Sequence, residues 1–350
     1  MGACFLFVVL TFYAAMSEVA WLFLLALWLL ALVPVAFAYA IWNRRGVTLG
    51  LQVRESEPAA GSPAEDLPDA VLRRSPQLAP VFEGDGMGLE IALRARGGAR
   101  GPVWAAGEVG GRKFGAGTGL VTRAGWSRVK WAREVWRGVV RASGWVVGTS
   151  DPLGFFQGLR KLPEAEVALI LPRFASLAHR HPSREVEASL AAPRAGSGNE
   201  MFGIREYRPG DSLRRIHWRS SARHGQLVVR EYEPPGVRTV AILVDPQPPT
   251  TEIADQLARI VASEAWDCVS EGGRVVLPGA LETTDIWRVL EWLARYPSPS
   301  SPTNAEEMAD IVVTANPDLM RHDAIRNWLV GDAPVDTDFA FERVGTTWPL

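Results

Sequence analysis

The N-terminal part of the chain is almost continuously apolar. Residues 19–42 contain 24 amino acids without a charge, enough for a helix that crosses the roughly 30 Å hydrocarbon core of a bilayer. Residues 3–16 form a second apolar run, about six residues short of a comfortable span. Arg44 and Arg45 follow Trp42 and favour the cytoplasmic side. The pattern predicts a transmembrane helical hairpin over residues 1–45, with a single span and an external apolar segment as the alternative.

A different periodicity begins after this segment. Residues 46–170 contain short apolar or alternating runs that are separated by glycines, and this spacing is typical of antiparallel strands. The runs cover residues 47–55, 89–95, 103–109, 119–123, 127–131 and 139–147. They predict a small β-sandwich domain, and we expect tryptophans to fill its core. The candidates are Trp104, Trp126, Trp131, Trp136 and Trp145.

The C-terminal segment, residues 239–350, alternates apolar strands with amphipathic helices. Apolar runs predict strands at residues 240–244, 274–277 and 311–314, and a last strand at 339–343. Helical spacing of apolar positions predicts helices at residues 251–270, 284–295 and 318–330. This alternation indicates an α/β domain with a mostly parallel sheet. The fold class predicted for the whole chain is membrane-anchored α+β, with a helical hairpin, a β-sandwich and a Rossmann-like α/β domain.

Between the two domains, residues 171–238 contain the most charged stretch of the chain. Residues 205–233 read REYRPGDSLRRIHWRSSARHGQLVVREYE, with seven arginines and four carboxylates. Pro209 and Gly210 have the spacing of a type II turn, and Asp211 is placed to cap a following helix. The pattern predicts a strand–turn–helix–strand module. If its strands pair, arginines of one strand can meet carboxylates of the other.

Three interpretations of this stretch are open from its residues. A structural or protein-contact module is favoured, because charges of both signs alternate along it. A hydrolase with a Gly-Asp-Ser-Leu nucleophile would use Ser212, but the nearby base His217 lies five residues further on and not on the same helix face. A nucleic-acid-binding module would use the arginines of residues 205–230 as phosphate contacts, which the interleaved carboxylates oppose.

Composition and charge narrow the function classes. The net charge of −2 gives no general affinity for polyanions, and residues 251–350 carry 17 acidic and 7 basic residues. Because the chain has only two cysteines, Cys4 and Cys268, a disulfide framework and a CxxC zinc site are excluded. His179 and His181 form a pair without a nearby third ligand, so we expect no metal there.

The charged stretch closely resembles the signature of the domain of unknown function 58 family. That signature has an Arg-x-Tyr-x-Pro-Gly-Asp turn, then Arg-x-Ile-x-Trp, then Ala-Arg, and a strand that ends near Arg-Glu. The matching residues are Arg205, Tyr207, Pro209, Gly210, Asp211, Arg215, Ile216, Trp218, Ala222, Arg223, Arg230 and Glu231. Weaker agreement extends to residues 81–84 and to the turn at residues 151–155.

The resemblance implies a bacterial inner-membrane protein with most of its chain in the cytoplasm. Members of the family are often encoded beside MoxR-type AAA+ ATPases, and sometimes beside transglutaminase-like membrane proteins. We therefore expect a non-enzymatic scaffold or adaptor whose partners are the membrane, such an ATPase and other membrane proteins. We expect no catalytic residue, no cofactor and no nucleic-acid partner, and the signature residues serve the fold or contact the partner.

The resemblance also implies that the C-terminal domain is similar to a von Willebrand factor A domain. A metal-binding domain of that type has Asp-x-Ser-x-Ser after its first strand, which supplies oxygen ligands to a divalent ion. Here Asp245 is kept, but Gln247 and Pro249 replace the two serines. We therefore expect a degenerate site without a metal. The hydroxyls that could still contribute belong to Thr283, Thr284 and Thr314.

Overall fold

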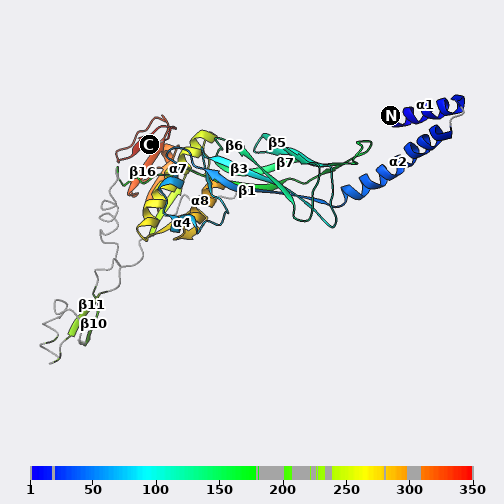
Figure 1. Cartoon of the computed structure of the whole chain (residues 1–350). Helices are drawn as coiled ribbons and strands as arrows, with labels where there is room; N and C mark the ends of the chain where they lie inside the picture. Colours follow the sequence, from blue (N-terminus) through cyan, green and yellow to red (C-terminus); the bar gives the residue numbers. More distant parts are fainter. Residues whose placement is uncertain are drawn as a thin grey trace. The chain divides into compact units, whose positions relative to one another are not determined.

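The computed structural model describes residues 2–17, 20–178, 180, 201–206, 221, 226, 228–232, 239–279, 281–297 and 309–348. The chain divides into two compact units, Met1–Leu171 and Pro172–Leu350. The first unit contains two N-terminal helices followed by two β-sheets (Figure 1). The second unit contains a six-stranded sheet with its helices, together with a separate strand pair.

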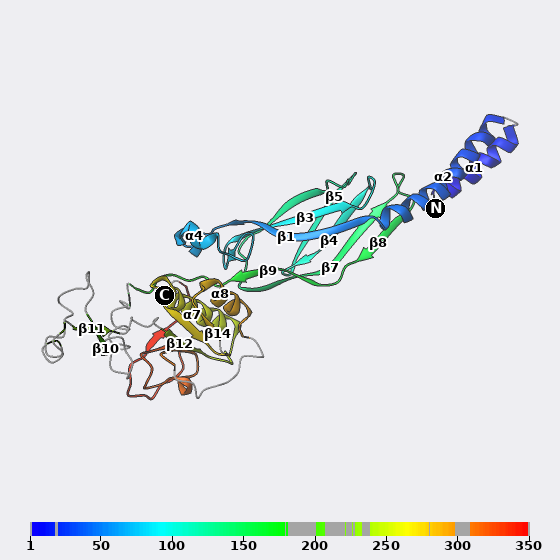
Figure 2. The same ribbon diagram turned by 90° about the horizontal axis from the view of Figure 1, so that it is seen from below.

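Two apolar helices open the first unit. α1 (Gly2–Ser17) and α2 (Ala20–Arg44) lie side by side in both ribbon views (Figures 1 and 2). The part of α2 from Trp21 to Arg44 has 24 residues and is long and apolar enough to cross a membrane, whereas α1 has 16 residues. Large apolar side chains of α2 are exposed, with Trp28 at 73%. The hairpin of two membrane spans stays a prediction.

Two sheets enclose the core of the rest of the first unit. One has the order β1-β3-β6 and contains β1 (Val47–Glu57), β3 (Gly86–Ala95) and β6 (Trp126–Ala132). The other has the order β2-β9-β7-β4-β5, with β8 paired to β7, and contains β2 (Val81–Phe82), β4 (Val103–Val109), β5 (Arg112–Thr118), β7 (Gly138–Ser150), β8 (Gln157–Lys161) and β9 (Ala165–Leu171). Short helices α3 (Pro63–Asp66) and α4 (Asp69–Leu72) lie between β1 and β2. Leu89 and Ile91 of β3 join Ala105 and Val147 of the second sheet in one apolar cluster, so the two sheets share a core.

Of the tryptophans expected in this core, Trp145 alone is fully buried, at 2% exposure. Its ring packs on the backbone of Gly107, where any side chain would collide with it, and its indole N–H donates to a backbone carbonyl of β4 at 3.0 Å. Trp104 and Trp131 are 39% and 46% exposed because each alternates with a buried neighbour on its strand and faces outward. Trp136 lies in a loop and is 72% exposed. The prediction of an aromatic core is therefore wrong for these three residues.

The second unit is built around a six-stranded sheet with the order β14-β13-β12-β15-β16-β17. Its strands are β12 (Thr239–Val244), β13 (Arg274–Leu277), β14 (Leu281–Thr283), β15 (Ile311–Thr314), β16 (Arg326–Val330) and β17 (Glu342–Val344). All neighbouring pairs in this sheet are parallel except β13–β14. Counted along the chain, the order is 3-2-1-4-5-6, the doubly wound arrangement in which the first and fourth strands are central neighbours.

Helices α7 (Thr251–Ser270) and α8 (Ile286–Arg295) accompany this sheet. The Thr250 hydroxyl accepts a backbone N–H of the first turn of α7 at 3.3 Å, and the Asp285 carboxylate does the same for α8 at 3.1 Å. α7 agrees with the predicted helix. α8 starts slightly later than predicted because Asp285 occupies the cap position outside the helix.

The helix predicted over residues 318–330 is wrong. The structure has a 3-10 turn, η2 (Pro317–Leu319), followed by strand β16. Trp328 and Leu329 are fully buried, and β16 pairs with β15 on one side and β17 on the other. A short apolar run that is buried on both faces has no periodicity that separates a strand from a helix, which explains the error. The last strand, β17, also starts later than the predicted residue 339.

Candidate functional site

The charged signature stretch forms a two-stranded antiparallel sheet. Its strands are β10 (Met201–Glu206) and β11 (Val228–Tyr232). The register pairs Arg205 with Val229, so the position of Arg205 is diagonal to that of Glu231. The positions of Glu206 and Arg230 are diagonal in the same way. Diagonal positions on neighbouring strands are about 7–8 Å apart, within reach of long side chains. The two predicted strands therefore pair, and the arginine–carboxylate contacts between them stay a prediction.

Most of the signature lies outside the described residues. This is the case for Tyr207, Pro209, Gly210, Asp211, Ser212, Arg215, Trp218 and Arg223, and for both members of the histidine pair. The turn, the capped helix and the nucleophile considered at Ser212 therefore stay predictions. Arg205, Arg230 and Glu231 are the signature residues that the structure places, and all three belong to the β10–β11 pair.

Asp245 follows directly after β12, at the carboxyl end of a central strand. One carboxylate oxygen accepts the Thr314 hydroxyl at 2.9 Å and the Ala315 backbone N–H at 3.1 Å, and the other accepts the Gln247 N–H at 2.9 Å. The Tyr296 hydroxyl donates to the backbone carbonyl of Asp245, and the residue is 3% exposed. Ligands of doubly wound sheets bind at this edge, where the first and fourth strands meet.

The donors around Asp245 come from the protein itself. Three hydrogen bonds satisfy its two carboxylate oxygens, so the side chain clamps the end of β12 to the end of β15. Of the threonines considered as further ligands, Thr314 contacts Asp245, whereas Thr283 accepts the N–H of Asp285 beside α8. Within the part of the chain that the structure describes, no group of three or more His, Cys, Asp and Glu could hold a metal ion.

Residues 203–263 match the family model described as protein of unknown function DUF58. The chain carries a DUF58 segment. The match confirms the family resemblance that the signature residues predict. No curated protein and no solved structure matches the chain.

The DUF58 segment extends from β10 through β11 and β12 into α7. It therefore contains the signature and Asp245, whereas Thr314 and Tyr296 lie beyond its end. The hydrogen bonds of the Asp245 carboxylate consequently join the DUF58 segment to the strands of the sheet that lie beyond it. Sequence reasoning considered Thr314 among several hydroxyls but missed Tyr296, which lies 51 residues away and carries no motif.

A second buried carboxylate lies next to the DUF58 segment, on α7. Glu264 is 5% exposed and accepts hydrogen bonds from the Arg326 guanidinium and, at 2.8 Å, from the indole N–H of Trp328. Both donors belong to β16, so this cluster ties α7 to that strand. Sequence reasoning missed the cluster because it expected a helix where β16 lies.

Outside the DUF58 segment, the first unit has a polar cluster where α2 joins the sandwich. Asn43 is fully buried, donates to the Ser150 carbonyl at 2.9 Å and accepts the Gly101 N–H at 3.0 Å. The Tyr39 hydroxyl donates to the Gly101 carbonyl at 2.8 Å. Because buried amide groups need such partners, these bonds hold the last two turns of α2 against the second sheet.

Arg100 adds a buried positive charge to this junction. Its guanidinium carbon lies 3.1 Å from the ring centroid of Trp42, as in a cation–π contact. The residue is 7% exposed, and its Nε and Nη1 atoms have no hydrogen-bond partner. A side chain at Gly46 would collide with the guanidinium, so the glycine makes room for it.

The turn after β7 contains the Asp-Pro-Leu-Gly-Phe sequence noted above. Asp151 is buried and accepts the Phe156 N–H at 2.6 Å and the Leu153 N–H at 2.9 Å. Burial by itself would raise the pKa of Asp151, but these backbone donors outweigh it and hold the pKa below its usual value. The ionised carboxylate thus shapes the turn from inside, while Leu153 and Phe155 remain exposed.

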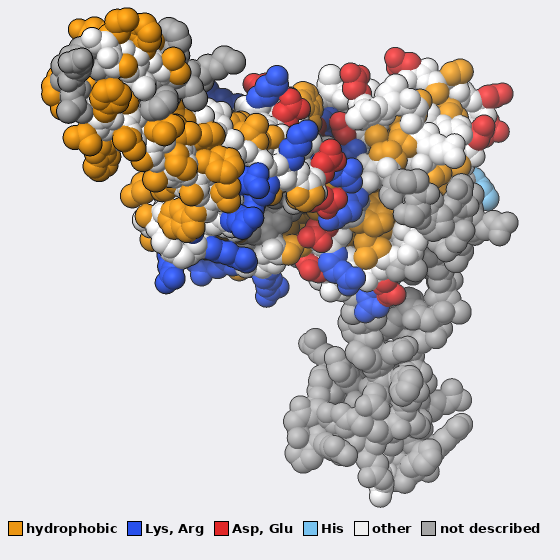
Figure 3. Space-filling model, turned by 90° about the vertical axis from the view of Figure 1, so that its right-hand side faces the viewer, with side chains coloured by type: hydrophobic (Ala, Val, Ile, Leu, Met, Phe, Trp, Pro, Cys, Tyr) orange, Lys and Arg blue, Asp and Glu red, His pale blue; other side chains and the backbone are white. Residues whose placement is uncertain are grey.

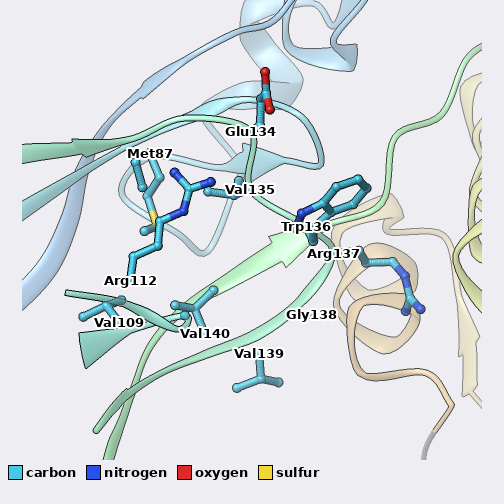
Figure 4. A pocket seen from close by; sticks show the side chains of 12 residues that line it. Met87, Val109, Arg112, Glu134, Val135, Trp136, Arg137, Gly138, Val139 and Val140 are labelled. Carbon is cyan, nitrogen blue, oxygen red and sulfur yellow. The ribbon is translucent and has the colours of Figure 1, made fainter. Parts of the chain in front are cut away.

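A cavity of about 200 Å³ lies at the other end of β7, near Gly138. Figure 4 shows the Arg112 side chain extending towards Met87 and Val135, with Trp136 at the side of the cavity. The lining contains no Ser, Thr, Cys, Lys or His, and it offers aromatic, apolar and cationic contacts together with the carboxylate of Glu134.

Proposed function

We propose that the chain is a non-enzymatic scaffold or adaptor that is anchored in the bacterial inner membrane and works with a MoxR-type AAA+ ATPase. Its role is the assembly or maturation of protein complexes, some of them with other membrane proteins. In this proposal α1 and α2 form a hairpin with both ends in the cytoplasm, and the sandwich and the α/β domain lie on the cytoplasmic side. The mechanism requires no cofactor and no nucleic acid.

The state of Asp245 is the observation that carries the proposal. In a metal-binding von Willebrand A domain, the aspartate after the first strand presents its oxygens to an ion. In this chain three protein donors occupy those oxygens instead. We infer a von Willebrand A-like domain that has lost its metal site and kept its framework for protein contacts. The 3-2-1-4-5-6 strand order, with Asp245 after the first strand, supports this inference.

The DUF58 segment is the basis for the ATPase partner. Proteins that carry this signature are often encoded beside MoxR-type ATPases, and an adaptor that meets such a partner needs complementary charged surfaces. The sequence contains two segments of opposite net charge. The signature stretch is rich in arginine, whereas residues 251–350 carry 17 acidic and 7 basic residues.

Affinity purification of the full-length chain from solubilised membranes of its host tests this proposal. We expect a MoxR-type AAA+ ATPase to co-purify with it. Reversing the charge of both placed signature arginines, Arg205→Glu and Arg230→Glu, is expected to lower the recovered ATPase several-fold. The reason is that loss of charge complementarity at an interface weakens association.

The matched control reverses two exposed arginines of the sandwich, Arg128→Glu and Arg133→Glu, and should leave recovery unchanged. Repeated purification without any ATPase would count against the proposal. Equal losses in the signature variant and the control variant would contradict the role given to the DUF58 segment.

A further inference from the structure

The rim of the sandwich next to α2 exposes large apolar side chains. The exposed fractions are 58% for Leu120, 53% for Leu153, 43% for Phe155 and 58% for Leu159. These four residues, called the apolar rim below, come from the loop after β5, the turn after β7 and strand β8. Exposed apolar residues that gather in this way mark an interaction surface. The contacts of the same segments with α2 indicate what covers them.

The turn after β7 reaches the level of the membrane-capable part of α2. The ring of Phe156 packs edge-on against Phe37, with ring centroids 5.3 Å apart. Phe37 precedes Trp42 by five residues, which is about 7.5 Å along the helix axis. Side chains of a helix lean towards its N-terminus, so the Phe37 ring points away from the polar C-terminal end of α2. The turn therefore lies beside the apolar segment of α2 and not beyond its C-terminal end.

The loop after β5 is held beside the last turns of α2. Tyr39 donates to the Gly101 carbonyl at 2.8 Å, and Gly101 lies directly against Gly119 and Leu120, whose backbone atoms would collide with any side chain there. Because Trp42 at the end of an apolar span marks the membrane interface, the turn after β7 flanks α2 on the bilayer side of that mark. The loop after β5 lies close to the level of Trp42, since Gly101 also donates to Asn43.

Basic residues surround the polar side of the apolar rim. Figure 3 shows Lys and Arg side chains gathered next to the apolar helical end of the first unit. The exposed members at this end are Arg44, Arg45, Arg96 and Arg123. The backbone N–H of Arg96 donates to Gly46 at 2.6 Å, and the Arg123 guanidinium donates to the Gly97 carbonyl at 3.0 Å, so both lie beside the end of α2. The buried charge of Arg100 lies in the same place.

We propose that the apolar rim inserts into the headgroup region of an anionic phospholipid bilayer and anchors the sandwich beside α2. Leu153 and Phe155 enter the lipid, and the basic residues contact the phosphates. This inference rests on the membrane anchoring by α2 that is proposed above. It adds that the sandwich is held against the membrane at several points, so its orientation to the bilayer is restricted.

A fluorescence-quenching experiment on the full-length chain tests the inference. Single cysteines are introduced at Leu153, at Leu30 of α2 and at Leu78, in a background of Cys4→Ala and Cys268→Ala. Each is labelled with a nitrobenzoxadiazole probe, and the protein is reconstituted into vesicles of phosphatidylcholine and phosphatidylglycerol with nitroxide-labelled lipids. Leu78 is the control because it is 78% exposed and adjoins Gln77, whose side chain donates to the Leu169 carbonyl near the end of β9. It follows α4 in the chain by six residues, and α4 lies at the end of the sandwich away from α2 (Figure 2).

We expect nitroxide lipids to quench most of the fluorescence at Leu30 and Leu153 and little at Leu78. Adding Phe155→Glu should reduce quenching at Leu153 several-fold and leave Leu30 unchanged, and omitting phosphatidylglycerol should also reduce it. If Leu30 is quenched while Leu153 behaves like Leu78, the interfacial anchor is wrong and the membrane anchoring stands. If Leu30 is not quenched, the anchoring by α2 and the inference both fail.

Discussion

Replacing Glu264 with alanine is expected to destabilise the α/β domain by about 3–5 kcal/mol, because it leaves a buried charge without its partner. The carboxylate is 5% exposed and accepts from the Arg326 guanidinium and from the Trp328 indole at 2.8 Å. Arg326 has a side-chain exposure of 10%, so its charge is largely shielded from bulk water. Glu264→Gln keeps an acceptor for Trp328 but removes the negative charge, and we expect an intermediate loss.

Hydrogen exchange measured by mass spectrometry on the purified full-length chain resolves this effect locally. Peptides from β16 and α7 should lose protection, while peptides from β3 in the first unit should not change. Glu252→Ala, in the exposed first turn of α7, provides the control and should change stability by less than about 1 kcal/mol. A loss below about 1 kcal/mol in the Glu264→Ala variant would contradict the importance of this cluster.

Replacing Asp245 with alanine is expected to loosen the carboxyl ends of β12 and β15 by about 2 kcal/mol, at roughly 1–3 kcal/mol for a donor that is left unpaired away from water. The donors that lose their acceptor are the N–H groups of Ala315 and Gln247, whereas the Thr314 hydroxyl can still donate to the Asn316 carbonyl at 3.1 Å. Asp245→Asn keeps one acceptor oxygen but turns an amide N–H₂ group towards one of these donors. We therefore expect it to lower the free energy of unfolding, but by less than Asp245→Ala does.

The same exchange experiment with and without Mg²⁺ separates a structural clamp from a metal ligand. Protection at the ends of β12 and β15 should be equal under both conditions, because protein donors already occupy both carboxylate oxygens of Asp245. If Mg²⁺ protected the wild-type chain and not the Asp245→Ala variant, the aspartate would be a metal ligand, and the clamp would be wrong.

Much of the fold follows from local patterns in the sequence. The strands at residues 103–109, 274–277 and 311–314 and the helix at 251–270 have the bounds that the apolar spacing predicts. The strands at 103–109 and 274–277 alternate buried and less buried positions, and the helix begins at a capping residue. The strand at 311–314 is buried on both faces, and its short length separates it from a helix. The alternation on both sides of Pro209 and Gly210 likewise predicts the strands β10 and β11, whereas it leaves their pairing open.

The remaining features depend on tertiary contacts that no local pattern carries. β16 is buried on both faces, so its sequence did not separate a strand from a helix. Trp104 and Trp131 have the composition of core residues, but strand alternation turns them outward. Asn43 did offer a signal, since it is a polar residue between an aromatic interface residue and two arginines. Its partners Ser150 and Gly101 are distant in sequence and could not be named.

The central claim is that the chain holds an AAA+ ATPase at the membrane, and the distribution of that ATPase between cell fractions tests it most directly. In host cells that contain the full-length chain, we expect most of the MoxR-type ATPase in the membrane fraction. In cells that lack the chain, we expect it in the soluble fraction, and restoring the wild-type chain should return it to the membrane. A distribution that is the same with and without the chain would contradict the account.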